Sequence, residues 1–132
     1  MPTFSKLSEQ RLATCDPRLQ RILREAIKSV DFTVLCGYRT EEEQEDAFRS
    51  GRSTVHFPNS KHNTIPSSAV DIAPYPVDWK DTARFARLAG YIERIAHEQG
   101  VRIRWGGDWD QDWQTSDERF VDMPHIELVE DL

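Results

Sequence analysis

The chain has 132 residues, of which 38% are hydrophobic and 30% charged, so its size and balance fit one globular domain and exclude a disordered chain. Its 17 basic and 23 acidic residues give a net charge of −6, which argues against nucleic acid as a partner because phosphate binding needs a basic surface. No stretch approaches the length of a membrane span, and residues 1–6 are not followed by the apolar run of a secretory signal. We therefore expect a monomer that stays in the cytoplasm and does not bind membranes.

The first half of the chain predicts three helices and one strand. A short helix is expected near residues 9–13. An amphipathic helix follows, for which Asp16 suits the N-cap and Pro17 the first helical position. Residues 32–36 are rich in β-forming side chains and predict a strand. Thr40 then caps an acidic helix over residues 41–50, which ends at a glycine.

The second half predicts one long helix and three short strands, separated by two long loops at 52–67 and 106–121. Strands are expected at residues 69–73, 101–105 and 125–129, and the helix at residues 81–99. The longest of these, 81–99, has an apolar stripe at helical spacing and is followed by Gly100. We expect a single α+β domain over residues 1–132, with helices on one side of a small antiparallel sheet.

The two cysteines and two of the four histidines carry little chemical signal. Cys15 and Cys36 form no C-x-x-C pair, so cysteine ligation of a metal is not indicated, and both are expected to be reduced in a cytosolic protein. His97 lies near the polar end of the long helix, where a cation favours the helix dipole. His56 lies in the 52–67 loop without an acidic neighbour in the sequence, and we do not expect it in the site.

His62, Asp71, Asp122 and His125 are spaced so that they can meet. His62 lies in the loop that leads into the strand holding Asp71, so the loop can fold back and bring imidazole and carboxylate together. A turn can place Asp122 and His125 on one face. Two histidines and a carboxylate form a standard catalytic zinc set, and a second carboxylate is then needed to carry a proton. The same spacing also fits a protein without metal, in which His62 is a loop residue and Asp122 and His125 only shape a turn. Both interpretations stay open.

Four motifs in chain order resemble one enzyme family. They are Ser60-x-His62 with Ser68-Ala69-Val70-Asp71, Asp122-x-Pro124-His125-Ile126-Glu127, Gly37-Tyr38-Arg39-Thr40 with Gln44, and Trp105-Gly106-Gly107-Asp108-Trp109. Together they are similar to the zinc D-Ala-D-Ala carboxypeptidase and L-alanyl-D-glutamate endopeptidase family, whose members share the Hedgehog/DD-peptidase fold. The resemblance extends over residues 32–128. One departure is the loop between His62 and Asp71, which is longer than in many relatives and lacks glycine.

The resemblance implies Zn²⁺ as the cofactor and assigns roles to seven residues. The implied metal ligands are His62, Asp71 and His125. Asp122 is the implied general base. Arg39 is implied to face the substrate, where its guanidinium can bind a carboxylate or a developing oxyanion, although a surface arginine at a helix start would explain it without the resemblance. Ser60 and Gln44 are candidates for peptide binding; taken alone, Gln44 on an acidic helix suggests a solvent-exposed residue.

The tryptophans and aspartates of the 106–121 loop form two further patterns. An aromatic row in a polar loop can line a groove for an extended peptide or sugar, whereas core packing is the simpler role for Trp105 at a strand end. The tryptophans of the chain are Trp79, Trp105, Trp109 and Trp113. Alternating aspartates from Asp108 resemble the start of a calcium loop, but Trp113 and Arg119 replace its glycine and glutamate. We interpret this segment as a solvated acidic loop, with calcium binding as the alternative.

The resemblance implies hydrolysis of the L-Ala–D-Glu bond in the stem peptide of bacterial peptidoglycan. An aspartate as base and the Trp105–Trp109 segment are features of the phage and spore-former endopeptidases. A peptidase domain without a separate wall-binding domain suits a bacteriophage endolysin that waits in the host cytoplasm before host lysis. Two alternatives stay open: a D-Ala-D-Ala carboxypeptidase of the same fold, and a catalytically inactive wall-binding module. The complete ligand set together with Asp122 argues against the inactive module.

Overall fold

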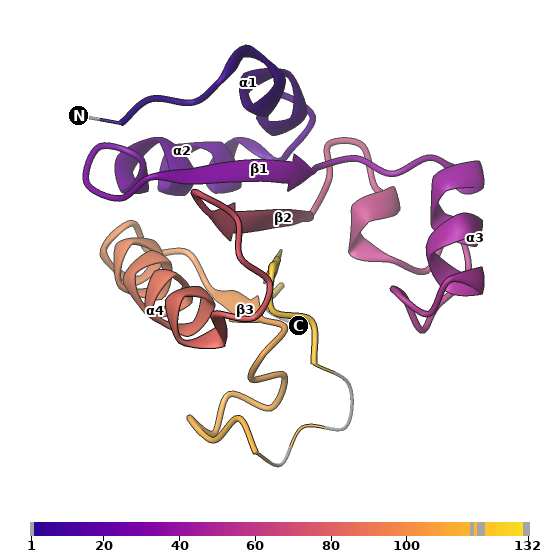
Figure 1. The fold of residues 1–132 in the computed structure, drawn as a ribbon. Coiled ribbons are helices and arrows are strands. Elements are labelled where there is room, and N and C mark those ends of the chain that lie inside the picture. Colours follow the sequence, from indigo (N-terminus) through magenta and orange to yellow (C-terminus); the bar gives the residue numbers. More distant parts are fainter. Residues whose placement is uncertain (1, 117, 119–120, 131–132) are drawn as a thin grey trace.

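The structure, a computed structural model, describes residues 2–116, 118 and 121–130 (Figure 1). Its elements over these residues are α1 (Lys6–Leu12), α2 (Pro17–Ala26), β1 (Phe32–Cys36), α3 (Glu41–Arg49), the 3₁₀ helix η1 (Lys61–Asn63), β2 (Ala69–Pro74), α4 (Thr82–Glu98), β3 (Ile103–Trp105) and β4 (His125–Leu128). The expected α+β class, a small antiparallel sheet with flanking helices, is confirmed. None of the described helices is long and apolar enough to cross a membrane.

The predicted caps explain most of the helix boundaries. The side chain of Asp16 accepts a hydrogen bond from the backbone of Arg18 at the start of α2. Thr40 and Glu43 form a reciprocal capping box at the start of α3. The first helix begins earlier than expected because Ser5 caps it through the N–H of Ser8. Strand β3 is shorter than expected and begins only at Ile103.

The four strands pair in the order β1-β2-β4-β3, and every pair is antiparallel. Because side chains alternate across a strand, the register assigns each residue to one of two faces of the sheet. One face carries apolar side chains that are all buried in one core: Phe32, Val34, Val70, Ile72, Ile103, Trp105, Ile126 and Leu128. The opposite face carries Asp71, His125, Glu127 and Arg104. The sheet therefore separates the hydrophobic core from a charged surface.

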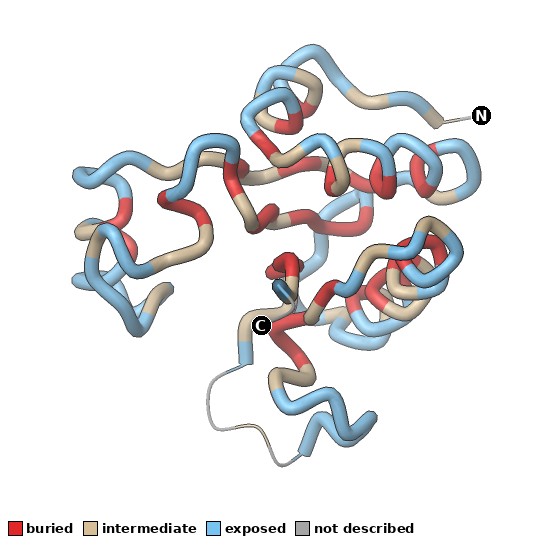
Figure 2. Tube along the Cα trace, turned by 180° about the vertical axis from the view of Figure 1, so that it is seen from behind, coloured by how far each residue is buried: buried red, intermediate tan, exposed pale blue. Residues whose placement is uncertain are grey.

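Helices α2 and α4 pack against each other and complete the core beneath the apolar face. Their buried positions recur at helical spacing, from Leu19 to Ala26 and from Phe85 to Ala96. Figure 2 shows the buried residues concentrated in the strands and along the inner sides of these helices, while residues 108–116, which follow β3, are mostly exposed. Helix α1 packs along the edge strand β1.

Helix α3 and η1 lie beyond the end of β1, away from the main core (Figure 1). They are joined by polar contacts: the Asn63 amide nitrogen donates to the carbonyl oxygen of Arg39 at 3.0 Å and faces Gln44 Oε1 at 3.4 Å. The backbone N–H of Arg39 donates to the carbonyl oxygen of His62 at 2.8 Å. These bonds fix η1 above the charged face of the sheet, at the point where β1 ends.

Candidate metal centre and active site

Three side chains from separate elements turn their ligand atoms toward one position. His62 comes from η1, Asp71 from β2 and His125 from the start of β4, where Asp71 and His125 are register partners. The three ligand atoms are His62 Nε2, Asp71 Oδ1 and His125 Nδ1. Each pair of these atoms is 3.2 Å apart. The structure therefore brings together the three residues that the sequence indicated as possible metal ligands.

This triangle of ligand atoms has the dimensions of a zinc site. Zinc holds nitrogen and oxygen ligands at about 2.0–2.2 Å in tetrahedral geometry, which separates neighbouring ligand atoms by about 3.3 Å. Two imidazoles and one carboxylate are also a donor set of catalytic zinc sites, which keep a further position open for water. The donors and their spacing thus fit a zinc ion.

A hydrogen bond on its far side fixes each histidine ring. His62 Nδ1 lies 2.8 Å from the carbonyl oxygen of Gly37, and His125 Nε2 lies 2.8 Å from Glu127 Oε1. The ring nitrogens that face Asp71 are therefore His62 Nε2 and His125 Nδ1. The turn at position 37 needs glycine, because a Cβ there would overlap the Thr14 side chain and the backbone of α1.

Burial and charge act against each other on the pKa values of these groups. Burial lowers the pKa of His62, but the negative charge of Asp71 and its hydrogen bond outweigh burial and raise that pKa to about 10. Burial favours the neutral acid of Asp71, yet the charge of His62 and hydrogen bonds from both rings hold its pKa well below the usual range. These directions describe the metal-free protein, because a metal displaces the ring protons when it binds.

Asp122 lies beside the triangle. Its Oδ2 is 3.8 Å from His125 Nδ1, and its carbonyl oxygen accepts from the backbone N–H of His125 at 3.1 Å. Its own backbone N–H donates to the carbonyl oxygen of Gly106 at 2.8 Å, which holds this turn against the end of β3. Burial, and then the charge of Asp71, raise the pKa of Asp122 to about 6. A carboxyl group with such a pKa suits proton transfer near neutral pH.

Arg39 follows the end of β1 and is held between two partners. Its Nη1 donates to Gln44 Oε1 at 2.9 Å, and its Nη2 lies 3.4 Å from Asp71 Oδ2. Gln44 is fully buried, and its amide nitrogen donates to Ser53 Oγ and to the carbonyl oxygen of Val55. The amide of Gln44 therefore supports the guanidinium of Arg39 from behind. This burial differs from the exposed position that the acidic helix suggested.

Two adjoining hollows open beside the triangle and share Arg39, Arg52 and Asp122 in their walls. The first has a volume of about 680 Å³ and a partly apolar wall, formed by Leu35, Trp79, Val121, Met123 and Pro124. The second has a volume of about 420 Å³ and a more polar wall that includes Lys61 and Arg104. Ser60 lines this second hollow, and its Oγ also accepts from the backbone N–H of His62 at 3.1 Å.

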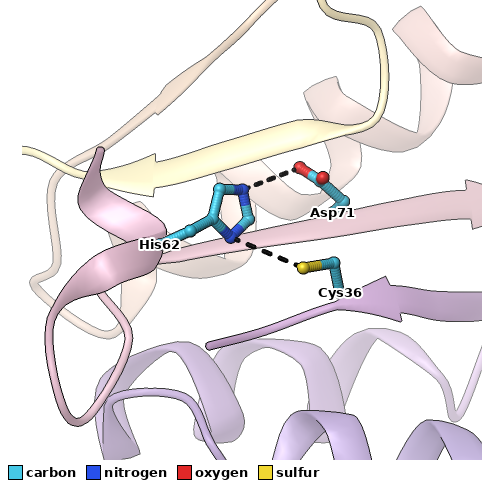
Figure 3. Close-up of side chains that lie close together, drawn as sticks. All are labelled: Cys36, His62 and Asp71. Atoms are coloured by element: carbon cyan, nitrogen blue, oxygen red, sulfur yellow. Dashed lines mark hydrogen bonds and ion pairs between the residues drawn. The ribbon is translucent and has the colours of Figure 1, made fainter. Parts of the chain in front are cut away.

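Cys36 lies on the opposite side of the His62 ring from the carboxylate of Asp71 (Figure 3). Its Sγ is 4.0 Å from His62 Nδ1, the nitrogen that already faces the Gly37 carbonyl. Cys36, His62 and Asp71 form another group of potential metal ligands, as do Asp71, Asp122 and His125. Because the thiol and the carboxylate approach different ring nitrogens, the position shared by His62, Asp71 and His125 is the better metal site.

The tryptophans are divided among the core, the hollows and the surface. Trp105 is buried in the core, and its indole N–H donates to the carbonyl oxygen of Met123 at 2.7 Å. Trp79 is exposed and lines the first hollow. Trp109 lies with its ring centroid 5.3 Å from that of His125, whereas Trp113 is exposed. Only part of the aromatic row therefore faces the candidate site.

Three aspartates of the 106–121 loop, Asp108, Asp110 and Asp112, bond to the loop's own backbone. Asp108 accepts from the N–H groups of Asp112 and Trp113, as expected for a solvated acidic loop. Asp108, Asp110, Asp112 and Glu118 also lie close enough together to form a group that could hold a cation. Arg119, which replaces the glutamate of a calcium loop, lies outside the described residues.

Two contacts of charged side chains were not apparent from the sequence. His56 Nδ1 lies 2.8 Å from Glu45 Oε2 on α3, an acidic partner that is remote in the sequence. Glu127 is only 5% exposed and lies next to His125 on the charged face. Burial disfavours its charge, but hydrogen bonds from His125 and Arg104 outweigh burial and lower the pKa of Glu127 to about 2. The two-residue spacing on a strand was the available signal for Glu127.

Comparisons with known proteins agree on one family. Residues 2–129 match the family described as phage L-alanyl-D-glutamate peptidase. The chain is 35% identical to the L-alanyl-D-glutamate peptidase of Escherichia phage T5, with 96% of this chain and 97% of that protein covered. The crystal structure of the Serratia marcescens L-Ala D-Glu endopeptidase ChiX superimposes with a TM-score of 0.76 at 29% identity. That match covers 96% of this chain and 90% of that chain.

The close packing of α1 and Thr14 around Gly37 can be tested by substitution, with Gly90 as the control position. Gly37→Ala is expected to destabilise the protein by about 1–3 kcal/mol, because the new Cβ forces apart packed backbone. Gly90→Ala is expected to stabilise it by about 0.5–1 kcal/mol, because Gly90 lies inside α4 with nothing near its Cβ position. Urea unfolding of both variants measures the changes. An unchanged free energy of unfolding for Gly37→Ala would contradict the role given to this turn.

Proposed function

The chain belongs to the phage L-alanyl-D-glutamate peptidase family, and we propose that it is a zinc-dependent endopeptidase that cuts the L-Ala–D-Glu bond of the peptidoglycan stem peptide. The observation that carries the proposal is the triangle formed by His62 Nε2, Asp71 Oδ1 and His125 Nδ1, with 3.2 Å sides. The names of the relatives supply the substrate, and the triangle supplies the means of hydrolysis.

Zinc held by these three residues would polarise a carbonyl group and lower the pKa of a coordinated water to about 7. The chain's own contribution is proton transfer. Asp122, which lines both hollows, is placed to take a proton from the attacking water and give it to the leaving amine of D-Glu. Its burial beside Asp71 raises its pKa toward neutrality, so it can be unprotonated before the reaction and release the proton afterwards.

Arg39 is the proposed contact for the substrate's charge. D-Glu in the stem peptide carries a free carboxylate beside the scissile bond, and a fixed guanidinium can bind it in a charge-assisted pair. Arg39 lines both hollows, and Gln44 holds it in place from the buried side. We therefore give Gln44 a positioning role, and Ser60, in the wall of the second hollow, a substrate-binding role.

The shape of the site favours an internal bond over a terminal one. The two hollows share Arg39 and Asp122 in their walls, and together they offer room for peptide on both sides of the scissile bond. The basic side chains of the second hollow offer a local positive charge to an anionic peptide, although the whole chain has a net charge of −6. A carboxypeptidase would need only one of these hollows.

The proposed setting follows from the phage family. The peptidase acts as a monomeric endolysin that waits in the host cytoplasm until it is released to the cell wall. Its partner is then the stem peptide itself.

Metal analysis tests the ligand set. We expect one zinc per chain in the wild-type protein and none retained in His62→Ala or His125→Ala, because each variant leaves two of three ligands. His97→Ala is the matched control, since His97 is exposed on the last turn of α4. Zinc bound with equal strength by wild type and His62→Ala would refute the proposed site.

Kinetic analysis tests the general base. Asp122→Asn is expected to keep zinc and the fold but to lose about 10²–10⁴-fold in kcat, because a positioned base contributes that much. Asp31→Asn removes an exposed carboxylate outside the site and is expected to keep full activity. Should Asp122→Asn lose its zinc instead, Asp122 would be a metal ligand and Asp71 would need reassignment.

Digestion of purified peptidoglycan tests the bond. Labelling of new amino termini, followed by mass spectrometry, is expected to reveal D-Glu as the new N-terminal residue. Release of free D-Ala without a new amino terminus inside the stem would establish the carboxypeptidase alternative. Zinc-loaded protein that leaves peptidoglycan intact would support the inactive wall-binding alternative.

A further inference from the structure

We infer that Glu127 is a positioning residue that sets the tautomer of the metal ligand His125, while Arg104 and Lys61 neutralise its charge. This inference rests on the proposed function, because it takes His125 as a zinc ligand. It assigns a task to a buried carboxylate that proton transfer and substrate binding leave unused. The relevant contacts all lie on the charged face of the sheet and in its immediate surroundings.

The strand geometry places the two residues together. His125 and Glu127 are two apart on β4, so their side chains leave the strand on the same face. Glu127 Oε1 lies 2.8 Å from His125 Nε2. An ionised carboxylate can only accept a hydrogen bond, so Nε2 must carry the ring proton. The lone pair of the neutral ring is then on Nδ1, the nitrogen that faces Asp71 Oδ1 and His62 Nε2 at 3.2 Å.

His62 is held in the opposite tautomer by the same logic. Its Nδ1 lies 2.8 Å from the carbonyl oxygen of Gly37, which can only accept, so the proton is on Nδ1 and the lone pair on Nε2. Each ring therefore presents an unprotonated nitrogen to the common position. The carbonyl behind His62 belongs to the backbone and survives any side-chain substitution. The carboxylate behind His125 can be replaced, and this makes its role testable.

The second oxygen of Glu127 has a separate task. Glu127 Oε2 lies 2.7 Å from Arg104 Nη2 and 3.3 Å from Lys61 Nζ, so two cations balance the charge of a carboxylate that is only 5% exposed. A role limited to pairing with these cations needs one oxygen only. It does not explain why Oε1 accepts a hydrogen bond from His125 Nε2, on a ring whose Nδ1 faces the metal position.

This division of the two oxygens predicts what glutamine would do at position 127. The amide oxygen of Glu127→Gln would turn toward Arg104 and Lys61, because both can only donate. The amide NH₂ would then face His125 Nε2 and favour the tautomer that carries its proton on Nδ1. That proton occupies the nitrogen needed for zinc, so metal affinity should fall by about 10–100-fold, as for other outer partners of ligating histidines.

The test measures zinc affinity by chelator competition in wild type, Glu127→Gln, Arg104→Gln and Glu98→Gln. Glu98 pairs with Arg94 on the surface and controls for the loss of a negative charge. We expect weaker zinc binding, by about 10–100-fold, for Glu127→Gln, and near wild-type binding for Arg104→Gln, which keeps the Glu127–His125 bond. Nitrogen NMR of the His125 ring in the zinc-loaded proteins, at saturating zinc, reads the ring proton, and it should show an Nε2–H hydrogen-bonded to Glu127 in wild type and the loss of that bond in Glu127→Gln.

The outcomes separate this inference from the proposed function. Glu127→Gln that binds zinc as tightly as wild type, with an unchanged Nε2–H signal of His125 in the zinc-loaded protein, overturns the inference alone. Equal losses in Glu127→Gln and Arg104→Gln overturn it too, since they would mean that charge pairing suffices. Wild-type protein that binds no zinc overturns the proposed function as well. If Glu127→Gln does not fold, Glu127→Asp keeps the charge but is too short to reach both partners, and its zinc affinity decides in the same way.

Discussion

The carboxylate of Asp71, whose side chain is only 14% exposed, is the charge on which the site depends. A carboxylate in the low-dielectric interior is tolerated only with partners for both oxygens. Here Oδ1 faces the two histidines and Oδ2 faces Arg39. Asp71 lies in the middle of a sheet whose other face is the hydrophobic core, so packing fixes its position. The stability of the core and the geometry of the site are thus properties of the same strands.

Much of the fold could be predicted because its signals are local. The caps at Asp16 and Thr40 and the β-rich runs are each read from a few neighbouring residues. Strand order could not be predicted, since β2 pairs with β1 and with β4, and the pairs with β4 join residues more than fifty positions apart, such as Asp71 and His125. The candidate ligands followed from spacing and from the family resemblance. Their common position depends on the pairing of β4 with β2, which the sequence alone does not show.

Residues around the ligands were harder to predict, for physical reasons that differ from case to case. Gln44 looked exposed because its sequence neighbours are acidic, but Arg39, Ser53 and Val55 satisfy its amide from distant segments. His56 gained an acidic partner from α3, not from its own loop. Glu127 had a local signal in its spacing from His125, yet its meaning depends on Arg104 and Lys61, which come from other elements.

A crystal structure of the zinc-loaded protein, with anomalous data collected at the zinc edge, tests the central claim most directly. The account predicts an anomalous peak about 2.0–2.2 Å from His62 Nε2, Asp71 Oδ1 and His125 Nδ1, with Asp122 beside it and not bound to it. A peak coordinated by Cys36, or one confined to the acidic 106–121 loop, would contradict the account.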